Sequence, residues 1–329
     1  MIEVVSGGLQ TIVVDWPGRI GYWELAIPPS GPMDSLAFRL GNLLVGNAPG
    51  AAGLEIQFLG PELVFHGDCA VALTGAATDV ALDGGAFPMW RSVPVRAGQR
   101  LRIGSCLDAA RAYLCLSGGI DVPPFLGSFS TFLKGRVGGY EGRELKGGDR
   151  LQLKPRNERW IEDRRIREDH IPRYAEQRTI EVVLGPHDDW LDEAGVASFL
   201  GSAWEVLPAS DRTGYRIKGP DLTFSRKAYD KLPENGEHPS NIIDFGYSVG
   251  SFNLSGQTPI ILPVDGPSLG GFICPFTACQ AAMWKIGQAR PGDKLRMRSV
   301  TLDEADALTP ALNAWASSTS LEPASAPAP

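Results

Sequence analysis

Three segments dense in polar residues and glycine hold the side chains best suited to chemistry. The first is Ile27-Pro-Pro-Ser-Gly-Pro-Met-Asp34, in which Ser30 precedes an expected helix and Asp34 falls at its start. Its prolines fix φ, and Gly31 permits a tight turn. The segment is therefore either a rigid strand-to-helix turn or a place where backbone amides at a helix start face a carbonyl or carboxylate.

The second segment, Glu237-His-Pro-Ser-Asn-Ile-Ile-Asp244, mixes acids, amides and an imidazole between apolar strands. A hairpin loop needs only its proline and asparagine. Gathering His238, Asn241 and two carboxylates costs desolvation free energy unless the loop faces water or a ligand. This composition favours a functional loop over a simple hairpin connection.

The third segment runs from Pro263 to Cys274 and contains Asp-Gly-Pro-Ser followed by Gly-Gly. Asp265 offers an acceptor, and Ser268 offers a donor or an acceptor. The glycine pair that begins at Gly270 lets the backbone approach a flat ligand closely. A glycine-rich turn between strands explains the same local pattern, so both interpretations remain open.

Other chemistries have less support in the sequence. The four histidines lack metal-ligand spacing, and Cys274 and Cys279 lack a second cysteine pair, so no metal site is expected. His187-Asp188-Asp189 is better explained by acids at a helix start. Ser30 and Ser268 have no base nearby in the sequence, which disfavours nucleophilic hydrolysis. No P-loop is present, so ATP would be handled by a partner.

Short apolar alternations separated by Gly, Pro, Asp and Asn recur along the chain and predict strands of a barrel-like, all-β fold with a few short helices. The expected helices are Met33–Leu44, Asp188–Leu200 and Cys279–Gly287. The expected strands are Glu3–Val5, Thr11–Val14, Glu62–Phe65, Ala70–Leu73, Arg100–Ile103, Arg111–Leu116, Arg150–Leu153, Ile180–Leu184, Tyr215–Ile217 and Lys294–Met297.

The chain also repeats itself, which favours a duplicated architecture. Gly60-Pro-Glu-Leu-Val-Phe65 is echoed by Gly219-Pro-Asp-Leu-Thr-Phe224. Between the halves the alternation gives way to mixed charges, and the last residues are mostly Ala, Ser and Pro. We therefore predict a first domain at residues 1–154, a solvated connection at 155–179, a second domain at 180–305 and a disordered tail at 306–329.

The overall composition limits the possible partners and locations. The 329 residues carry a formal net charge of −7, which disfavours nucleic acid or an anionic membrane surface as a partner. No apolar stretch approaches the roughly 20 residues needed to span a bilayer, and the N-terminus does not resemble a signal peptide. Five cysteines without a regular framework suggest reduced thiols, so we expect a cytoplasmic protein.

Several motifs carry a resemblance to a known family. Asp15-Trp-Pro-Gly-Arg19, Gly138-Gly-Tyr-Glu-Gly-Arg143 and Asp211-Arg-Thr-Gly-Tyr-Arg216 resemble those of the biotin-dependent carboxyltransferase A/B-domain family. That family includes allophanate hydrolase subunit 2, the C subunit of 5-oxoprolinase and the carboxyltransferase region of urea carboxylase. His238–Asn241 and Asp265–Pro275 look like the urea carboxylase branch. The resemblance implies two tandem cyclophilin-like β-barrel domains.

The resemblance further implies an enzyme that moves CO2 from carboxybiotin to the nitrogen of a small urea-like or amide substrate. Biotin would be carried on a separate protein, because this sequence has no Met-Lys-Met-type biotinylation site. The implied partners are a second carboxyltransferase subunit (domains C/D, allophanate hydrolase subunit 1 type), a biotin carboxylase and a biotin carrier protein. ATP would be used only by a partner subunit.

Four residues are the candidates for catalysis under this resemblance. Asn241 and Asp265 would hold the substrate amide, and His238 would orient them. Lys285 would stabilise the transferred carboxylate. By itself Lys285 is a lone lysine on a short helix, and a lone lysine is usually a solvated charge.

Five further residues are candidates for substrate binding. Arg212 is an alternative to Lys285 as the partner of the carboxylate. The turn at Ser30 and Asp34 would form part of a carbonyl-binding wall. Ser268 would orient neighbouring polar groups, and Gly270 would let the backbone approach the ligand.

Two alternative functions remain open. The first is the C subunit of an ATP-dependent 5-oxoprolinase, an amide hydrolase that would again need partners. The second is a non-catalytic regulatory binding module. A prolyl isomerase has less support, since a cyclophilin-like fold does not by itself give that function. The substrate itself also remains open, because urea, guanidine-like compounds and small amides all present a similar combination of hydrogen-bond donors and acceptors.

Overall fold

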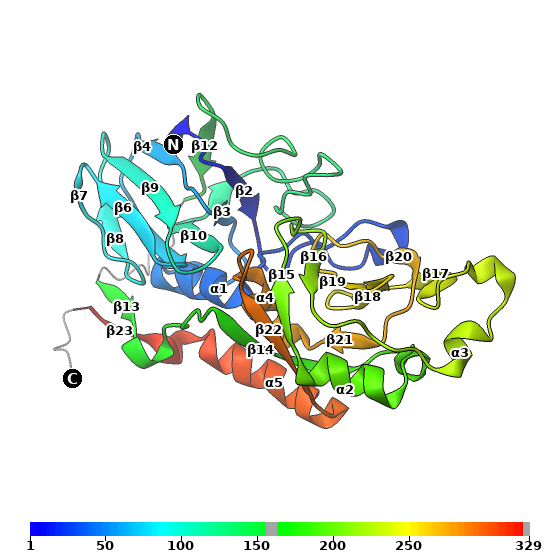
Figure 1. Cartoon of the computed structure of the whole chain (residues 1–329). Coiled ribbons are helices and arrows are strands. Elements are labelled where there is room, and N and C mark those ends of the chain that lie inside the picture. The colour runs from blue at the N-terminus through cyan, green and yellow to red at the C-terminus, as the bar shows by residue number, and fades with distance from the viewer. Residues whose placement is uncertain (156–162, 325–329) are drawn as a thin grey trace. The chain divides into compact units, whose positions relative to one another are not determined.

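The computed structural model describes residues 1–155 and 163–324 of the chain, and these form two compact units. Unit 1 contains Met1–Ile20, Pro29–Tyr174 and the described part of Leu312–Pro329, and unit 2 contains Gly21–Pro28 and Ala175–Ala311. The units thus interleave in sequence, because a short N-terminal segment belongs to unit 2 and the C-terminal segment belongs to unit 1. Figure 1 labels the elements, which are mostly strands.

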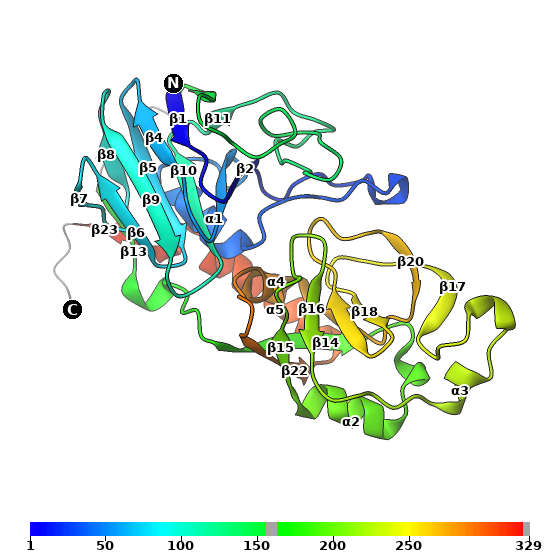
Figure 2. The same ribbon diagram turned by 45° about the horizontal axis from the view of Figure 1, so that its top comes forward.

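Unit 1 is built mainly from two antiparallel sheets, beside the two-stranded pairing of β13 (Arg164–Ile166) with β23 (Leu321–Pro323) (Figure 2). The larger has, in order, β11 (Ile120–Asp121), β12 (Arg150–Leu153), β1 (Ile2–Ser6), β4 (Glu62–Phe65), β9 (Arg100–Cys106), β6 (Thr78–Leu82) and β7 (Gly85–Ala86). The smaller has β2 (Gln10–Val14), β3 (Gly53–Gln57), β10 (Arg111–Leu116), β5 (Cys69–Gly75) and β8 (Val93–Val95). Residues of both sheets share one apolar core.

The strands of unit 1 show why the apolar pattern differs between the sheets. In β4 every second residue is buried, as expected of a strand with one face in the core. In β5 and β10 every residue is buried, because helix α1 (Ser35–Leu44) also packs against both strands. Phe38 of α1 meets Tyr113 of β10 edge to face, with ring centroids 5.9 Å apart.

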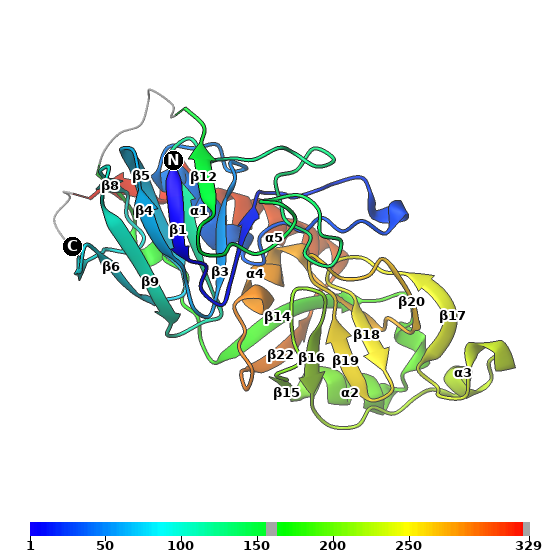
Figure 3. The ribbon, with the colours of Figure 1, turned by 90° about the horizontal axis from the view of Figure 1, so that it is seen from above.

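Unit 2 contains a seven-stranded sheet that nearly closes into a barrel (Figure 3). Its order is β18 (Phe252–Ser255), β19 (Thr258–Ile261), β16 (Tyr215–Lys218), β15 (Ala203–Val206), β22 (Lys294–Ser299), β14 (Gln177–Leu184) and β21 (Phe276–Ala278). Only β14 and β22 pair in parallel. A bridge between Ser251 and Thr277 joins the two ends of this order.

Aromatic side chains fill the core of unit 2. Phe199 of helix α2 (Glu193–Gly201) stacks on Phe276, with ring centroids 4.1 Å apart. Phe252 meets the same Phe199 ring edge to face at 5.3 Å, and the buried Trp204 packs against it at 5.4 Å. The helix is therefore fixed to the sheet by contacts between large apolar rings.

The remaining elements of unit 2 lie outside the seven-stranded sheet. A two-stranded ribbon pairs β17 (Asn241–Gly246) with β20 (Leu269–Phe272). The short helix α3 (Arg226–Tyr229) contacts η3 (Asp188–Trp190), whereas the short helix α4 (Met283–Gly287) packs against β14. The 3₁₀ turns of this unit are η1 (Trp23–Leu25), η3 (Asp188–Trp190), η4 (Pro233–Asn235) and η5 (Gln280–Ala282).

The C-terminal segment differs from the predicted disordered tail at 306–329. Residues 306–324 contain most of helix α5 (Leu302–Trp315), the turn η6 (Ser318–Ser320) and strand β23 (Leu321–Pro323). Strand β23 pairs with β13 (Arg164–Ile166), and the Trp315 indole donates to the His170 carbonyl at 2.7 Å. The prediction rested on the Ala, Ser and Pro content of this segment, which gives no sign of the contact made by Trp315 or of the pairing of strand β23. Residues 325–329 lie outside the described chain.

The predicted connection at 155–179 also differs in part. Residues 156–162 lie outside the described chain. The residues from 163 to 174 contain β13 and the 3₁₀ turn η2 (Glu168–His170), and they belong to unit 1. Strand β14 begins at Gln177, before the predicted domain start at 180. In the described chain, no helix is long and apolar enough to cross a membrane.

Candidate functional site in unit 2

The turn His238–Asn241 leads into strand β17 and is held by its own side chains. The Asn241 amide donates to the His238 carbonyl at 2.9 Å, which closes the turn. His238 Nδ1 lies 2.8 Å from Ser240 Oγ and accepts from the Ser240 amide at 3.1 Å. Ser240 Oγ also accepts from the Gly256 amide at 3.1 Å. This network gives His238 a clear positioning role within the turn.

Lys231 also holds this turn, and sequence reasoning missed it. Its Nζ donates to the Asn241 carbonyl at 2.9 Å and to the His238 carbonyl. Burial lowers the pKa of Lys231. Backbone carbonyls hold an ammonium group in place without adding a negative charge. The Asn241 side chain is thus presented from a backbone that is fixed at both ends of the turn.

Asp265 and Arg212 form a buried, bidentate ion pair. Arg212 Nε lies 2.7 Å from Asp265 Oδ2, and Arg212 Nη2 lies 3.3 Å from Oδ1. The Asp265 amide also donates to the Arg212 carbonyl at 3.0 Å. Only 5% of Asp265 and 3% of Arg212 is exposed. The structure therefore brings these two predicted residues together as one fixed unit.

Ser268 and Gly270 lie beside Tyr247, which immediately follows β17. The Tyr247 amide donates to the Ser268 carbonyl at 2.8 Å. A Cβ added at Gly270 would lie 2.8 Å from Cε2 of the Tyr247 ring, so any larger residue would have to displace that ring. Tyr247 Oη donates to the Phe272 carbonyl at 2.7 Å and accepts from the Phe272 amide at 2.8 Å.

The segment around Ser268 also matches the letters G-x-S-x-G, as Gly266-Pro-Ser268-Leu-Gly270. A nucleophile elbow places its serine between a strand and a helix. Here Ser268 is buried and immediately precedes strand β20, whose partner is β17. The surrounding structure is therefore not that of a nucleophile elbow.

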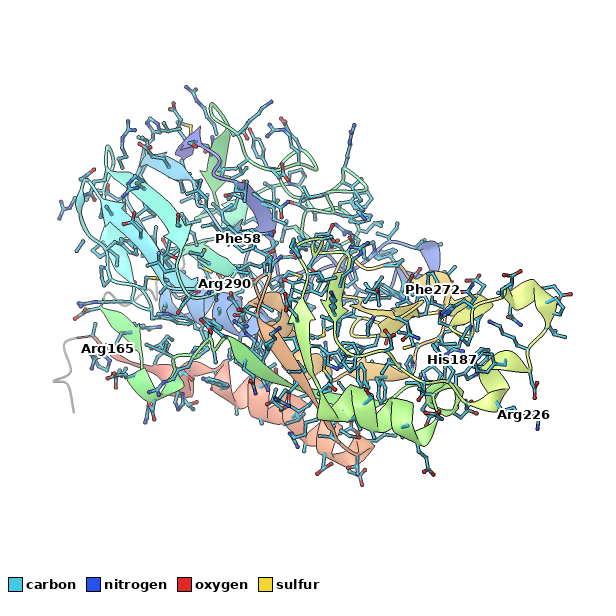
Figure 4. The ribbon with its side chains drawn as sticks, in the orientation of Figure 1. Phe58, Arg165, His187, Arg226, Phe272 and Arg290 are labelled. Atoms are coloured by element: carbon cyan, nitrogen blue, oxygen red, sulfur yellow. The ribbon has the colours of Figure 1, made fainter. Side chains whose placement is uncertain are left out.

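His187, which the sequence places beside two acids at an expected helix start, lies beside the same ribbon (Figure 4). Its Nδ1 accepts from the Cys274 amide at 3.2 Å, and its own amide donates to the Cys274 carbonyl at 3.2 Å. The ring meets Phe245 at 4.6 Å and Trp190 at 5.7 Å, both edge to face. Burial, together with the charge of Lys227, lowers the pKa of His187.

Lys285 is engaged elsewhere in unit 2. Its Nζ lies 2.8 Å from Glu181 Oε2 and donates to the Thr179 carbonyl at 3.0 Å. Glu181 also pairs with Arg298 at 3.2 Å. Burial alone would raise the pKa of Glu181, but these cations hold it below its usual value. None of the contacts found for Lys285 in the described chain reaches Asn241 or Asp265.

Ser30 and Asp34 lie in unit 1 and have clear structural roles there. Ser30 is buried with φ at 54°, inside the turn that precedes α1. Asp34 caps α1 by accepting from the Ala37 amide at 2.9 Å. Its other oxygen accepts from the Tyr174 hydroxyl at 2.9 Å. These contacts favour the rigid strand-to-helix turn of the two interpretations drawn from the sequence.

Unit 2 holds four features that could serve a small planar ligand. They are the backbone-fixed turn at Asn241, the paired carboxylate of Asp265, the glycine of the ribbon at Gly270 and the His187 imidazole between aromatic rings, and Asn241 and Asp265 have separate hydrogen-bond partners. No group of three or more His, Cys, Asp or Glu within residues 1–155 and 163–324 is arranged to hold a metal ion. The chain is therefore a mostly β protein whose candidate site combines neutral polar side chains with a charged pair, Asp265 and Arg212.

Comparison with known proteins extends this description. The model of the family "Carboxyltransferase domain, subdomain A and B" matches residues 25–299. The chain therefore belongs to this carboxyltransferase A/B family. Two relatives illustrate the range of the family, a urea amidolyase from Saccharomyces cerevisiae and the C subunit of 5-oxoprolinase from Escherichia coli.

The two relatives differ in how much of each is matched. The urea amidolyase is 41% identical over 315 residues, which cover 93% of this chain but 17% of the relative. The 5-oxoprolinase C subunit is 35% identical over 308 residues, which cover 93% of both chains. A crystal structure of the K. lactis urea amidolyase is similar over 98% of this chain and 21% of that one, with a TM-score of 0.89 and 36% identity. Relatives of this chain are thus parts or subunits of larger enzymes.

Proposed function

We propose that this chain is a carboxyltransferase subunit that moves CO2 from carboxybiotin to the nitrogen of a small urea-like or amide substrate. The observation that carries the proposal is that unit 2 holds both a turn at Asn241 fixed through its backbone and the buried, bidentate Asp265–Arg212 pair. Support also comes from identities of 40–41% to urea amidolyases and to a putative urea carboxylase. We further propose that each unit is a cyclophilin-like barrel that works in a complex in the cytoplasm.

The donors and acceptors of unit 2 fit a neutral ureido or amide group. The Asn241 carboxamide offers both a donor and an acceptor to such a group. Arg212 holds the Asp265 carboxylate with two bonds, so the carboxylate keeps a fixed orientation and a partly neutralised charge. When bound, carboxybiotin on its carrier would supply the carboxyl group and a ring nitrogen able to accept the proton of the substrate nitrogen.

The other predicted residues keep narrower roles in this proposal. His238 acts by positioning the Asn241 turn. Ser268 and Gly270 shape the approach to the ribbon beside Tyr247. Lys285 would need to leave Glu181 to reach a transferred carboxylate. Ser30 and Asp34 fix the start of α1 in unit 1 and would act on a carbonyl only through the backbone of that turn.

The proposal requires partners, because this chain spans only 17% of the urea amidolyase it matches. We propose a second carboxyltransferase subunit (domains C/D), a biotin carboxylase that uses ATP, and a biotin carrier protein. The test is a pull-down of the tagged chain from its native cells, followed by detection of biotinylated protein. Recovery of a biotin carrier supports the proposal, and recovery of only subunits without biotin contradicts it.

A second candidate is the C subunit of an ATP-dependent 5-oxoprolinase. One observation favours it: the E. coli protein of that name matches this chain over 93% of both lengths. In that case the co-purifying partners would support ATP-dependent hydrolysis of 5-oxoproline, with no dependence on biotin. Assay of the recovered complex with 5-oxoproline and with urea therefore separates the two candidates.

A further inference from the structure

His187 is a single hydrogen-bond donor in a fixed orientation beside the β17–β20 ribbon. It follows strand β14, and two bonds to Cys274 hold it, one from its amide and one to its Nδ1. Cys274 lies two residues after β20. Because Nδ1 accepts from a backbone N–H, the neutral ring must carry its proton on Nε2. The ring can therefore only donate at its free nitrogen.

Nothing in the described chain accepts a hydrogen bond from His187 Nε2, and this atom is not among the fully enclosed polar atoms without a partner. It is thus available to a ligand. The rings of Phe245 and Trp190 stand at 78° and 83° to the imidazole and wall it on two sides. These edge-to-face contacts add to the bonds with Cys274 in fixing the orientation of the imidazole ring.

The position of His187 connects it to the proposed substrate region. Phe245 lies on β17, opposite Gly270 of β20. Phe245 also lies 6.1 Å from the ring of Tyr247, which packs on Gly270. The nearest charged groups, Lys227 and Asp189, are paired with each other, so a neutral ligand meets little net charge here.

We propose that His187 Nε2 donates a hydrogen bond to the carbonyl oxygen of a ureido group, with Phe245 and Trp190 as the walls of this subsite. The inference rests on the proposed function, since it names a ligand-binding residue of the same site. Two ligands carry this chemistry, the urea-like substrate and the bicyclic ring of biotin. A neutral donor suits a carbonyl oxygen that gains negative charge as the ureido group reacts.

A matched pair of variants tests this role. In His187→Asn the amide oxygen can still accept from the Cys274 N–H, but the distal donor is lost. In His187→Gln a donor N–H remains near the position of Nε2, whereas the bond to Cys274 is weakened. If the role of His187 is purely structural, His187→Asn should bind the ligand as tightly as the unmodified protein does. The proposed role predicts that His187→Gln retains the most ligand binding.

The measurement is a titration of the full-length chain with urea and, separately, with biotin methyl ester, following the His187 ring nitrogens by 15N NMR. We expect a saturable shift of the Nε2 resonance with at least one ligand, and at least tenfold weaker binding in His187→Asn than in His187→Gln. A response to urea alone assigns the subsite to the substrate, and a response to the ester alone assigns it to biotin. No shift with either ligand, or equal binding by both variants, overturns the proposal.

Failure of the subsite and failure of the proposed function are separable. If a ligand shifts Nε2 but the assembled complex carboxylates nothing, the subsite stands and the carboxyltransferase proposal falls. If the complex carboxylates urea at an unchanged rate with His187→Asn, the subsite falls and the carboxyltransferase proposal stands.

Discussion

At the scale of single residues, the buried Asp265–Arg212 pair determines how mutations at the site must be interpreted. Replacing Asp265 with alanine leaves a buried guanidinium without its carboxylate. Breaking such a pair costs about 3–5 kcal/mol of unfolding free energy. We expect Asp265→Ala to show this loss in chemical denaturation. A loss below about 1 kcal/mol would contradict the view that the pair is fixed and buried.

The control for this experiment is the double variant Asp265→Leu/Arg212→Met, which removes both charges. Because no charge then remains unpaired, the double variant should unfold less readily than Asp265→Ala. If the double variant is catalytically inactive but as stable as the unmodified protein, the activity is lost because the two side chains are needed in the reaction and not because the chain unfolds.

Gly270 gives a second prediction at this scale. A methyl group at this position would meet the Tyr247 ring at 2.8 Å. Since overpacking typically costs about 1–3 kcal/mol, Gly270→Ala should lower the thermal midpoint of the chain. Gly67 is the matched control, because an added Cβ there meets nothing within 4 Å. Equal thermal midpoints for Gly270→Ala and Gly67→Ala would contradict this prediction, because the ribbon would then accommodate the added methyl group without cost.

His187 predicts a pH dependence of stability. Its pKa is lowered in the folded chain by burial and by Lys227, so the unfolded chain binds its proton first as the pH falls. Its contribution to stability is therefore complete above the unfolded pKa of about 6.5 and declines below it. Unfolding free energy measured from about pH 8 to pH 5 should decline more steeply for the unmodified protein than for His187→Asn. Parallel curves would contradict this assignment.

At the scale of elements, the turn before β17 depends on Lys231. Its two bonds to backbone carbonyls hold the ends of the His238–Asn241 turn together. Lys231→Met should therefore weaken ligand binding more than it lowers stability, with protection of the turn amides from hydrogen exchange reduced first. The matched control is Lys294→Met, which breaks a half-exposed pair with Glu205 that contributes little. Unchanged turn protection in Lys231→Met would contradict this role.

Many of these elements could be predicted from the sequence. The expected strands at Glu62–Phe65, Arg111–Leu116 and Arg150–Leu153 coincide with β4, β10 and β12. Apolar alternation and turn residues are local signals, so they locate such strands well. The predicted helix at Met33–Leu44 begins two residues later, at Ser35, because Asp34 serves as its N-cap.

The partners of the candidate residues could not be predicted in the same way. Asp265 pairs with Arg212, 53 positions away, and His187 with Cys274, 87 positions away. Contacts at such separations are set by the closure of the barrel and leave no periodic trace in the sequence. Lys231 carried no signal either, since its bonds are to backbone carbonyls that any residue possesses.

At the scale of the whole chain, the C-terminal segment is predicted to stabilise unit 1. The Trp315 indole donates to the His170 carbonyl, Asn313 accepts from the buried Arg39, and β23 pairs with β13. The Arg39 guanidinium also stacks on Trp16 at 4.3 Å. Truncation after Ala311 should therefore lower the thermal midpoint and expose β13 amides to hydrogen exchange. Truncation after Ala324 is the control and should leave both unchanged.

The measurement that tests the central proposal most directly is carboxyl transfer by the assembled complex. The chain is combined with its co-purifying partners, ATP, labelled bicarbonate and urea, and labelled N-carboxylated product is measured. We predict transfer that requires this chain and a biotinylated carrier and is lost in Asn241→Ala, with the fold of that variant verified by its thermal midpoint. Transfer that persists without this chain, or a complex that only hydrolyses 5-oxoproline, would contradict the proposal.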